Sequence, residues 1–185
     1  MRRIITSANL SLDGAIDEME RWHFMYFDDE AGAVADEQLF ASDALLMGRA
    51  TYEGFSTAWP DQTGEFADHF NAMPKYVVSD SLQEAGWNNV TIIRRAHLVD
   101  EIARLKKQDG KDILMYGFGP VARTLVEHGL LDEARFWLHP AFAGTTKSEH
   151  LLASEGFEPH LTLAGSQVLT SGIVVLRYRA TPREA

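Results

Sequence analysis

Two short apolar runs in this chain each end in glycine and pass directly into a helical pattern. One covers residues 44–47 and ends at Gly48-Arg49, and the other covers Asp112–Tyr116 and ends at Gly117. An apolar run of this length, followed by glycine and a helix start, predicts a buried strand of a parallel α/β sheet. Ligands of such sheets bind outside the carboxyl ends of the strands. The two glycine turns are therefore expected to face one crevice.

The rest of the chain alternates between strand and helix patterns. Further strands are expected at residues 3–10, 75–79, 90–94 and 133–143, the last bent at Pro140. Helices are expected at residues 28–42, 50–55, 98–107 and 121–129, with a short one ending before Met73-Pro74. Strand patterns at 161–170 and 173–181 flank Ser171-Gly172, which favours a hairpin. This order predicts an α/β fold in one domain, residues 1–185, with a central, mostly parallel mixed sheet flanked by helices and a C-terminal antiparallel hairpin.

Composition restricts the classes of function. The chain has 185 residues, 45% of them hydrophobic, which suits one buried core. It has no cysteine, which excludes disulfides, iron–sulfur clusters and cysteine nucleophiles, and its histidines lack metal-ligand spacing, so no metal site is expected. A net charge of −10 argues against nucleic-acid or anionic-membrane binding. With no signal-peptide or membrane-span pattern, we expect a cytoplasmic protein that binds a small molecule.

Each glycine turn has two interpretations. At Gly48-Arg49, the N–H groups of a helix start and a forked guanidinium together suit a phosphate, but an ordinary turn with a solvated arginine has the same sequence. At Gly117-Phe118-Gly119, the third glycine of the dinucleotide fingerprint is missing, so a Rossmann fold is poorly supported. That segment is either a ligand-binding turn or a tight connection that binds nothing.

Five segments in order suggest a family. They are Ser11-Leu12-Asp13-Gly14, residues 47–53, residues 75–79, Gly117-Phe118-Gly119, and residues 129–133. In this order the chain resembles the dihydrofolate reductase superfamily, in particular its bacterial branch related to the C-terminal reductase domain of the riboflavin-biosynthesis deaminase/reductase. The resemblance implies a dihydrofolate reductase-like fold, a homodimer, and NADPH-dependent oxidoreductase activity on a pterin- or pyrimidine-like acceptor, similar to 5-amino-6-(5-phosphoribosylamino)uracil reductase.

The resemblance also implies where the phosphates of NADPH bind. Gly48, Arg49 and Thr51 match the segment that holds the adenosine 2′-phosphate and the pyrophosphate. Ser79 matches a position near the 2′-phosphate, and Arg94 falls where the family often lines the adenine. A forked guanidinium and a hydroxyl suit a dianionic phosphate, which would explain how an acidic protein binds an anion.

Other matching positions lie toward the nicotinamide. Gly117, Phe118 and Gly119 match the turn whose backbone approaches the pyrophosphate and nicotinamide, although the family commonly has a small residue where this chain has Phe118. Ala8 and Ile16 match positions that resemble the nicotinamide wall. Ile16 is equally consistent with a buried anchor of the core.

The proton donor is the least defined part of the expected site. Dihydrofolate reductases place a carboxylate near the start of the first helix, where this chain has Asp28, Asp29 and Glu30. Capping and the helix dipole also favour carboxylates there. His23 is a further candidate donor, and the aromatic residues around it either line a pocket for a flat ring or pack in the core or a dimer surface. Glu30, Asp29 and His23 are therefore the catalytic candidates.

Two functions from different classes fit these observations. The first is an NADPH-dependent reductase of a small heterocycle. The second is a non-catalytic nucleotide-binding or interaction domain that retains the reductase fold. Binding of NADPH, and oxidation of it by a suitable acceptor, separate the two.

Overall fold

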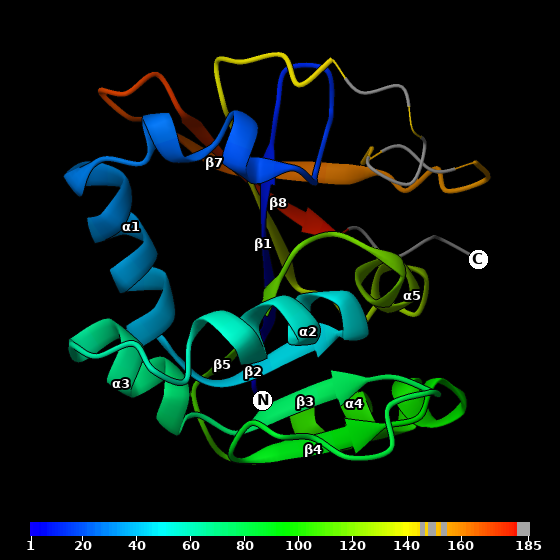
Figure 1. The fold of residues 1–185 in the computed structure, drawn as a ribbon. Coiled ribbons are helices and arrows are strands. Elements are labelled where there is room, and N and C mark those ends of the chain that lie inside the picture. Colours follow the sequence, from blue (N-terminus) through cyan, green and yellow to red (C-terminus); the bar gives the residue numbers. More distant parts are fainter. Residues whose placement is uncertain (145–146, 148–150, 153–154, 181–185) are drawn as a thin grey trace.

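An eight-stranded mixed sheet runs through the protein, in a computed structural model that describes residues 1–144, 147, 151–152 and 155–180. The strand order is β4-β3-β2-β5-β1-β6-β8-β7 (Figure 1). The first six strands are parallel, whereas β8 runs antiparallel to β6 and pairs with β7 as a hairpin. The predicted fold class is confirmed. The strands are β1 (Ile4–Leu10), β2 (Ser42–Gly48), β3 (Lys75–Val78), β4 (Val90–Ile93), β5 (Asp112–Tyr116), β6 (Glu133–Leu138), β7 (Leu161–Val168) and β8 (Val174–Ala180).

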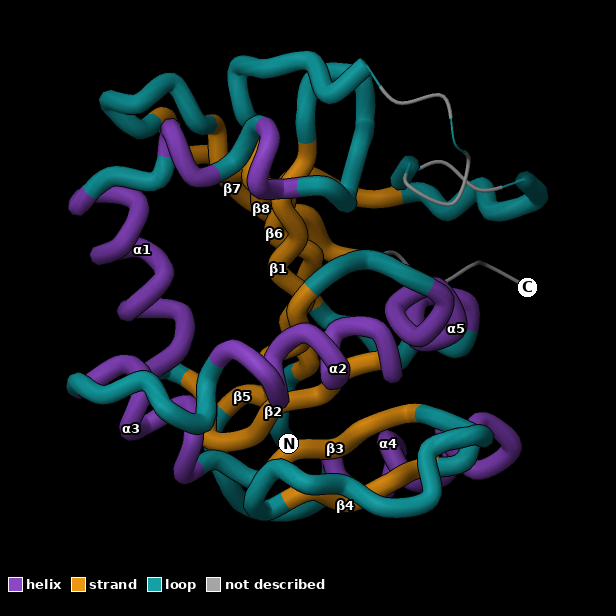
Figure 2. Tube along the Cα trace, in the orientation of Figure 1, coloured by secondary structure: helices purple, strands orange, loops and turns teal. Residues whose placement is uncertain are grey.

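Helices cover both faces of this sheet. Buried residues of α4 and α5 share one apolar cluster with the strands, and those of α1, α2 and α3 lie in clusters on the opposite face. Figure 2 shows α1 and α5 on opposite sides of β1 and β6. The helices in the described residues are α1 (Asp29–Phe40), α2 (Arg49–Ala58), α3 (Glu65–Ala72), α4 (Leu98–Lys106) and α5 (Pro120–Glu127), with short 3₁₀ helices η1 (Met19–Arg21), η2 (Phe24–Tyr26) and η3 (Arg95–His97).

The alternation of side chains along β2 shows how the sheet divides the core. Ala44 and Leu46 belong to the cluster shared with α4 and α5, whereas Leu45 and Met47 belong to the cluster shared with α2 and α3. This alternation follows from the period of two in a strand. All four side chains are almost fully buried, and each large one contributes about 1.5–3 kcal/mol of hydrophobic stabilisation. Burial on both faces fixes the position of Gly48, where β2 ends and α2 begins.

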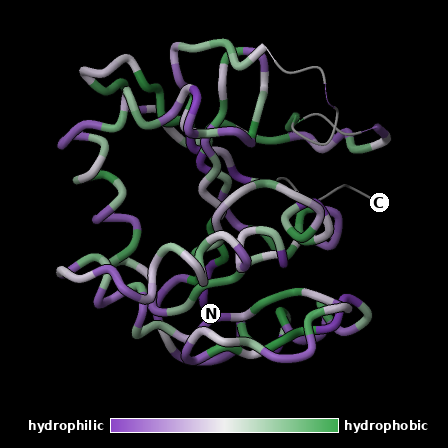
Figure 3. The backbone as a smooth tube through the Cα atoms, in the orientation of Figure 1, coloured by the Kyte–Doolittle hydropathy of each residue, from purple (hydrophilic) through white to green (hydrophobic). Residues whose placement is uncertain are grey.

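The start of α1 agrees with the expected cap. The side chain of Asp28 accepts a hydrogen bond of 2.9 Å from the backbone N–H of Ala31. Along α1, hydrophobic and hydrophilic stretches alternate in Figure 3, as expected for a helix with one buried face. The helix packs on β6 and β8 through a cluster that contains Ala31 and Trp137.

One strand ends earlier than the sequence predicts. The pattern predicted a strand over residues 133–143, but β6 ends at Leu138 because Pro140 has no N–H to continue the ladder. The chain then turns back onto the segment after β1, where the carboxylate of Asp13 accepts hydrogen bonds from Ser11 Oγ (2.5 Å) and from the backbone of Ala143 and Gly144. These bonds lower the pKa of Asp13 to about 2. At the hairpin, the predicted end at Thr181 lies outside the described residues.

Candidate functional site

A cavity of about 370 Å³ lies at the carboxyl ends of the central strands. Gly48 ends β2, Gly117 follows β5, and both line it, together with Thr51 of α2 and Gly119 at the start of α5. Because β2 and β5 are neighbours in the sheet, their carboxyl ends meet. Both glycine turns therefore border one cavity, as the sequence pattern predicts.

Two helices begin at this cavity without a side-chain cap. Gly48 and Gly119 are the N-cap residues of α2 and α5, and neither offers a side chain to the first-turn N–H groups. Neither helix has an acidic residue in its first turn. The N-terminus of α1 differs, since Asp28 caps it and Asp29 and Glu30 follow. Uncapped N–H groups and the helix dipole give the cavity wall a partial positive charge, which suits an anion.

Arg49 holds its guanidinium at the same cavity through two neighbours. Its Nε donates to Oε1 of Glu53 at 2.6 Å, and its Nη1 donates to the hydroxyl of Ser81. The side chain is about half exposed. Arg95 also lines the cavity, and its guanidinium lies 3.6 Å from a carboxylate oxygen of Asp80. Two guanidinium groups therefore border the cavity, each beside a carboxylate.

Ser79 and Arg94 hold a turn next to the cavity and do not line it. The hydroxyl of Ser79 accepts a 3.0 Å hydrogen bond from the backbone N–H of Leu82. Nη1 of Arg94 donates to the carbonyl oxygens of Ser79 and Leu82, both at 2.8 Å. This turn presents Ser81 to Arg49. Ser79 and Arg94 therefore shape the turn that places Ser81, and Ser81 bonds Arg49.

Sequence reasoning missed Ser81 and Arg95. Each lies within two residues of a residue that was named, in the runs Ser79-Asp80-Ser81 and Arg94-Arg95. The paired serines and the paired arginines in these runs were a signal that a neighbour of the named residue could make the contact. Arg95 lines the cavity and Ser81 bonds Arg49, and both placements depend on the path of the turn after β3 and on the start of η3, neither of which the pattern specifies.

Three other predicted residues lie in or against the core. Phe118 is 3% exposed, and its ring centroid lies 5.2 Å from that of Phe136. Gly117 has φ of +83°, a conformation open to glycine, so its backbone stays at the cavity while Phe118 turns inward. Ala8 is buried in the same cluster, and the half-buried Ile16 packs against it. The bulky Phe118 is therefore accommodated by the core.

At the start of α1, Glu30 contacts the β7–β8 turn and Asp29 faces solvent. Glu30 accepts hydrogen bonds from the backbone N–H of Thr170 at 2.7 Å and from its hydroxyl at 2.6 Å. These bonds lower the pKa of Glu30, so it is ionised at neutral pH and ties α1 to the β7–β8 turn. Asp29 is exposed in the first turn. This arrangement favours the interpretation of both residues as part of the helix start.

His23 is buried and paired with a second histidine. Its Nδ1 lies 2.8 Å from Nε2 of His139, whose Nδ1 lies 2.8 Å from the carbonyl oxygen of Trp137. A carbonyl only accepts, so this network assigns the protons to Nδ1 of both rings and leaves Nε2 of His23 as an acceptor. Burial, and then the neighbouring imidazole, lower the pKa of His23 to about 4. Burial also lowers the pKa of His139, so both rings are neutral at pH 7.

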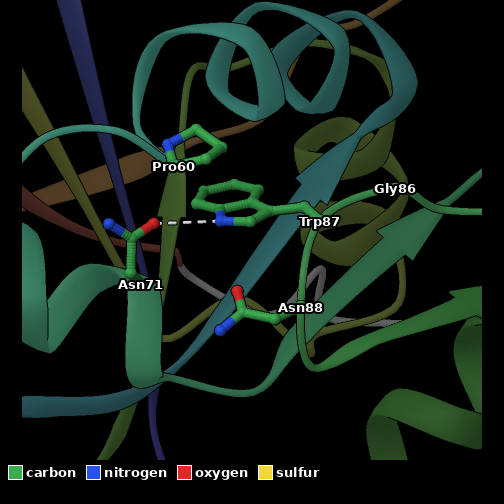
Figure 4. A pocket seen from close by; sticks show the side chains of 5 residues that line it. All are labelled: Pro60, Asn71, Gly86, Trp87 and Asn88. Atoms are coloured by element: carbon green, nitrogen blue, oxygen red, sulfur yellow. Dashed lines mark hydrogen bonds between the residues drawn. The ribbon is translucent and has the colours of Figure 1, made fainter.

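A second cavity, of about 270 Å³, has a structural explanation (Figure 4). In its wall the indole N–H of Trp87 donates to Oδ1 of Asn71 at 2.9 Å. Beside it, the fully buried Lys75 donates to the carbonyl oxygens of Asn71 and Met73, and its Nζ lies 4.4 Å from the Trp87 ring centroid. Burial lowers the pKa of Lys75 to about 8. These polar groups satisfy one another within the protein.

The described residues contain neither a metal-site grouping nor a membrane-spanning helix. No three His, Asp or Glu side chains in that part of the chain are grouped as a metal site. None of its helices is long and apolar enough to span a bilayer.

Comparison with known proteins gives consistent matches over most of the chain. The model of the RibD C-terminal domain family matches residues 2–175. The uncharacterized protein YyaP of Bacillus subtilis (strain 168) is 28% identical over 186 residues, covering 96% of this chain and 94% of its own length.

Solved structures share the fold at lower identity. A proposed riboflavin biosynthesis protein from Shewanella sp. PV-4 has a TM-score of 0.74 at 21% identity, covering 97% of this chain and 99% of that one. A pyrimidine reductase-like protein from Corynebacterium diphtheriae has a TM-score of 0.66 at 12% identity, covering 97% and 92%. The Thermotoga maritima diaminohydroxyphosphoribosylaminopyrimidine deaminase/5-amino-6-(5-phosphoribosylamino)uracil reductase has a TM-score of 0.66 at 14% identity, and the match covers 97% of this chain but 57% of that one.

Proposed function

The chain belongs to the RibD C-terminal domain family, and from that premise we propose that it is an NADPH-dependent reductase of a small pterin- or pyrimidine-like heterocycle. The observation that carries the proposal is the cavity where α2 and α5 begin without caps, beside Arg49. The acceptor class is supported by similarity to a structure described as pyrimidine reductase-like.

The residues around the cavity fit the anionic parts of NADPH. First-turn N–H groups of α2 and α5 suit the pyrophosphate, since Gly48 and Gly119 leave them uncapped. Arg49, with Arg95 and Ser81 close by, suits the 2′-phosphate. When bound, the cofactor supplies the hydride from its nicotinamide ring.

The protein's own contribution to the reaction is positioning. The backbone N–H of Gly117 donates to the carbonyl oxygen of Ser7 at 2.8 Å, which joins the cavity turn to β1. The sheet therefore continues from the cavity to the carboxyl end of β1, where an acceptor can lie against the cofactor. The reaction consumes NADPH, one proton and the acceptor, and yields NADP⁺ and the acceptor with two added hydrogens. Holding the two reactants in contact and excluding water are the main demands on such a site.

Arg49→Ala tests the cofactor assignment. We expect a loss of roughly 10-fold or more in NADPH affinity, measured by fluorescence titration, because charge-assisted bonds of this kind contribute about 1.5–3 kcal/mol. NADH affinity should change little, since NADH lacks the 2′-phosphate. Arg104→Ala is the matched control, because Arg104 is an exposed arginine paired with Glu101 on α4. Equal losses for both cofactors would contradict the 2′-phosphate assignment, and a wild-type protein that binds neither would contradict the reductase itself.

One observation favours a second candidate, a non-catalytic nucleotide-binding domain that retains the reductase fold. Glu30, one of the three candidates for the proton donor, is ionised and accepts hydrogen bonds from Thr170. Loss of NADPH absorbance with a panel of pterins, pyrimidines and quinonoid compounds separates the two functions. Tight NADPH binding with no oxidation across the panel would support the second.

A further inference from the structure

The face of the sheet toward α1 contains a buried donor without a partner. Trp137 is 3% exposed, and its indole N–H has no hydrogen-bond partner among the described residues. Trp137 lies opposite Asn9 of β1 in the parallel ladder, and both side chains are on the face away from the α4–α5 cluster. The Asn9 amide donates only to the sulfur of Met19, at 3.5 Å. Buried donors are nearly always paired, so an unpaired indole N–H is a candidate contact for a bound molecule.

A complementary acceptor belongs to His23, whose ring lies near the ring of Phe27, as that of Trp137 does. Nε2 of His23 is unprotonated in the tautomer that His139 imposes, and no described residue donates to it. The ring of Phe27 lies 5.3 Å from that of His23 and 6.4 Å from that of Trp137, between centroids. The rings of His23 and Trp137 therefore both pack near Phe27, which gives an aromatic setting with one donor group and one acceptor group in it.

This place adjoins the cofactor cavity along the sheet. The turn at Gly117 is bonded to Ser7, and Ser7 pairs with Tyr116. Asn9 is two residues further along β1, at a rise of about 3.3 Å per residue. The next strand, β6, places Trp137 beside Asn9. A ligand at Trp137 and His23 would thus approach the nicotinamide end of a cofactor whose adenosine end is at Arg49.

We propose that Trp137 and His23 bind the hydride acceptor by a cyclic amide edge. The indole N–H of Trp137 donates to a ring carbonyl oxygen, and Nε2 of His23 accepts from a ring N–H. His139 is a positioning residue, because its bond to the Trp137 carbonyl sets the tautomer of His23. The inference rests on the proposed reductase function and specifies its acceptor as a pyrimidinone or pterin that presents both groups.

The indole N–H signals of ¹⁵N-tryptophan-labelled protein test this directly. Pterin is the probe, and 2,4-diaminopteridine, with an amine in place of the carbonyl and no hydrogen on the adjacent ring nitrogen, is the comparison ligand. We expect pterin to shift the Trp137 signal, assigned by Trp137→Phe, while the indoles of Trp22 and Trp87 stay in place because they donate to Asp17 and Asn71. Pterin should bind Trp137→Phe about 10-fold more weakly, and 2,4-diaminopteridine, which loses the partners of both Trp137 and His23, should bind wild-type protein more weakly still. Trp87→Phe is the matched control variant, because Trp87 donates to Asn71 beside the second cavity, and it should bind pterin within about twofold of wild type.

His139→Gln tests the positioning role. We expect ring-nitrogen shifts of His23 to report a changed tautomer together with weaker pterin binding, which a merely structural residue would not produce. His23→Gln should weaken pterin binding without altering NADPH affinity.

The result that overturns the inference is an unshifted Trp137 signal, with equal pterin affinity in wild type and Trp137→Phe, or no pterin binding at all. NADPH titration of the same samples separates the two proposals. If NADPH binds in an Arg49-dependent manner while Trp137 stays silent, only this inference fails. If Trp137 responds to pterin and NADPH does not bind, the reductase proposal fails and the cyclic-amide site stands.

Discussion

The proposed cofactor end and the proposed acceptor end of the site differ in the atoms that build them. At the cofactor end, the backbone of Gly48, Gly117 and Gly119 forms the wall, and each turn is contiguous in sequence. At the acceptor end, the groups are side chains, and His23 and His139 are 116 residues apart. A backbone site can be recognised from local motifs, whereas a side-chain site depends on which distant segments meet.

Substitution of Trp137 should change the free energy of unfolding more than any other change considered. It tests whether the indole N–H, as distinct from the packing of the ring, contributes to stability. Trp137→Ala is expected to lower the free energy of unfolding by about 3–5 kcal/mol, because it leaves a cavity against α1. Trp137→Phe keeps most of the packing and removes an unpaired donor, so its loss should be under about 1.5 kcal/mol. Urea unfolding measures both. Similar losses for the two variants would mean that the indole N–H contributes to stability in the unliganded protein.

The histidine pair should make stability depend on pH. The pKa of His23 is about 4 in the folded protein, below its ordinary value of 6.5, so between these values the unfolded chain binds more protons. Stability is therefore present above pH 6.5 and is lost as pH falls toward 4. Between pH 7 and pH 5 the contribution of His23 is about 2 kcal/mol. His23→Gln should remove that part of the pH dependence in urea unfolding, and an unchanged slope would contradict a neutral buried His23.

The two glycines after β5 offer a matched pair at the cofactor end. Gly117 has φ of +83° and Gly119 has φ of −90°, and a Cβ at either would meet no atom within 4 Å. Gly117→Ala should therefore lower the free energy of unfolding by about 1–2 kcal/mol through backbone strain, and Gly119→Ala by a few tenths. Thermal unfolding compares them. Equal effects would indicate that local space, and not the backbone conformation, determines the choice of glycine at this turn.

Neutralising Glu53 should give the smallest effect. Glu53 bonds Arg49 at 2.6 Å on an exposed helix surface, where such pairs contribute at most about 1 kcal/mol. Glu53→Gln removes a negative charge beside the proposed 2′-phosphate, so NADPH affinity should rise about two- to fivefold with NADH affinity unchanged. Glu101→Gln, which releases Arg104, is the control. A fall in NADPH affinity would show that Glu53 is needed to orient Arg49.

Local pattern predicted most of the fold. The strands at β2 and β5, their glycine turns and the cap at Asp28 all follow from apolar periodicity and helix-start chemistry, and the structure contains each of them. The error at β6 came from treating Pro140 as a bend within a strand, whereas its missing N–H ends the ladder.

For the site, prediction reached the segment more often than the residue. Ser79 and Arg94 were named, but Arg95 lines the cavity beside Arg49, and Ser81 accepts a hydrogen bond from Arg49. Glu30 was one of three candidates for the proton donor, and Thr170 in the β7–β8 turn donates hydrogen bonds to it. Each discrepancy involves a contact with a residue from another segment, which no local pattern contains.

The sequence by itself determined the sheet and the two glycine turns, with Arg49 at one of them, because strand burial and helix starts depend on neighbouring residues in the chain. Only the tertiary structure decided that His23 faces His139 and that the indole of Trp137 is buried without a partner. The physical reason is that a hydrogen bond requires atoms within about 3 Å, and for side chains on separate elements that distance is set by the packing of the whole sheet.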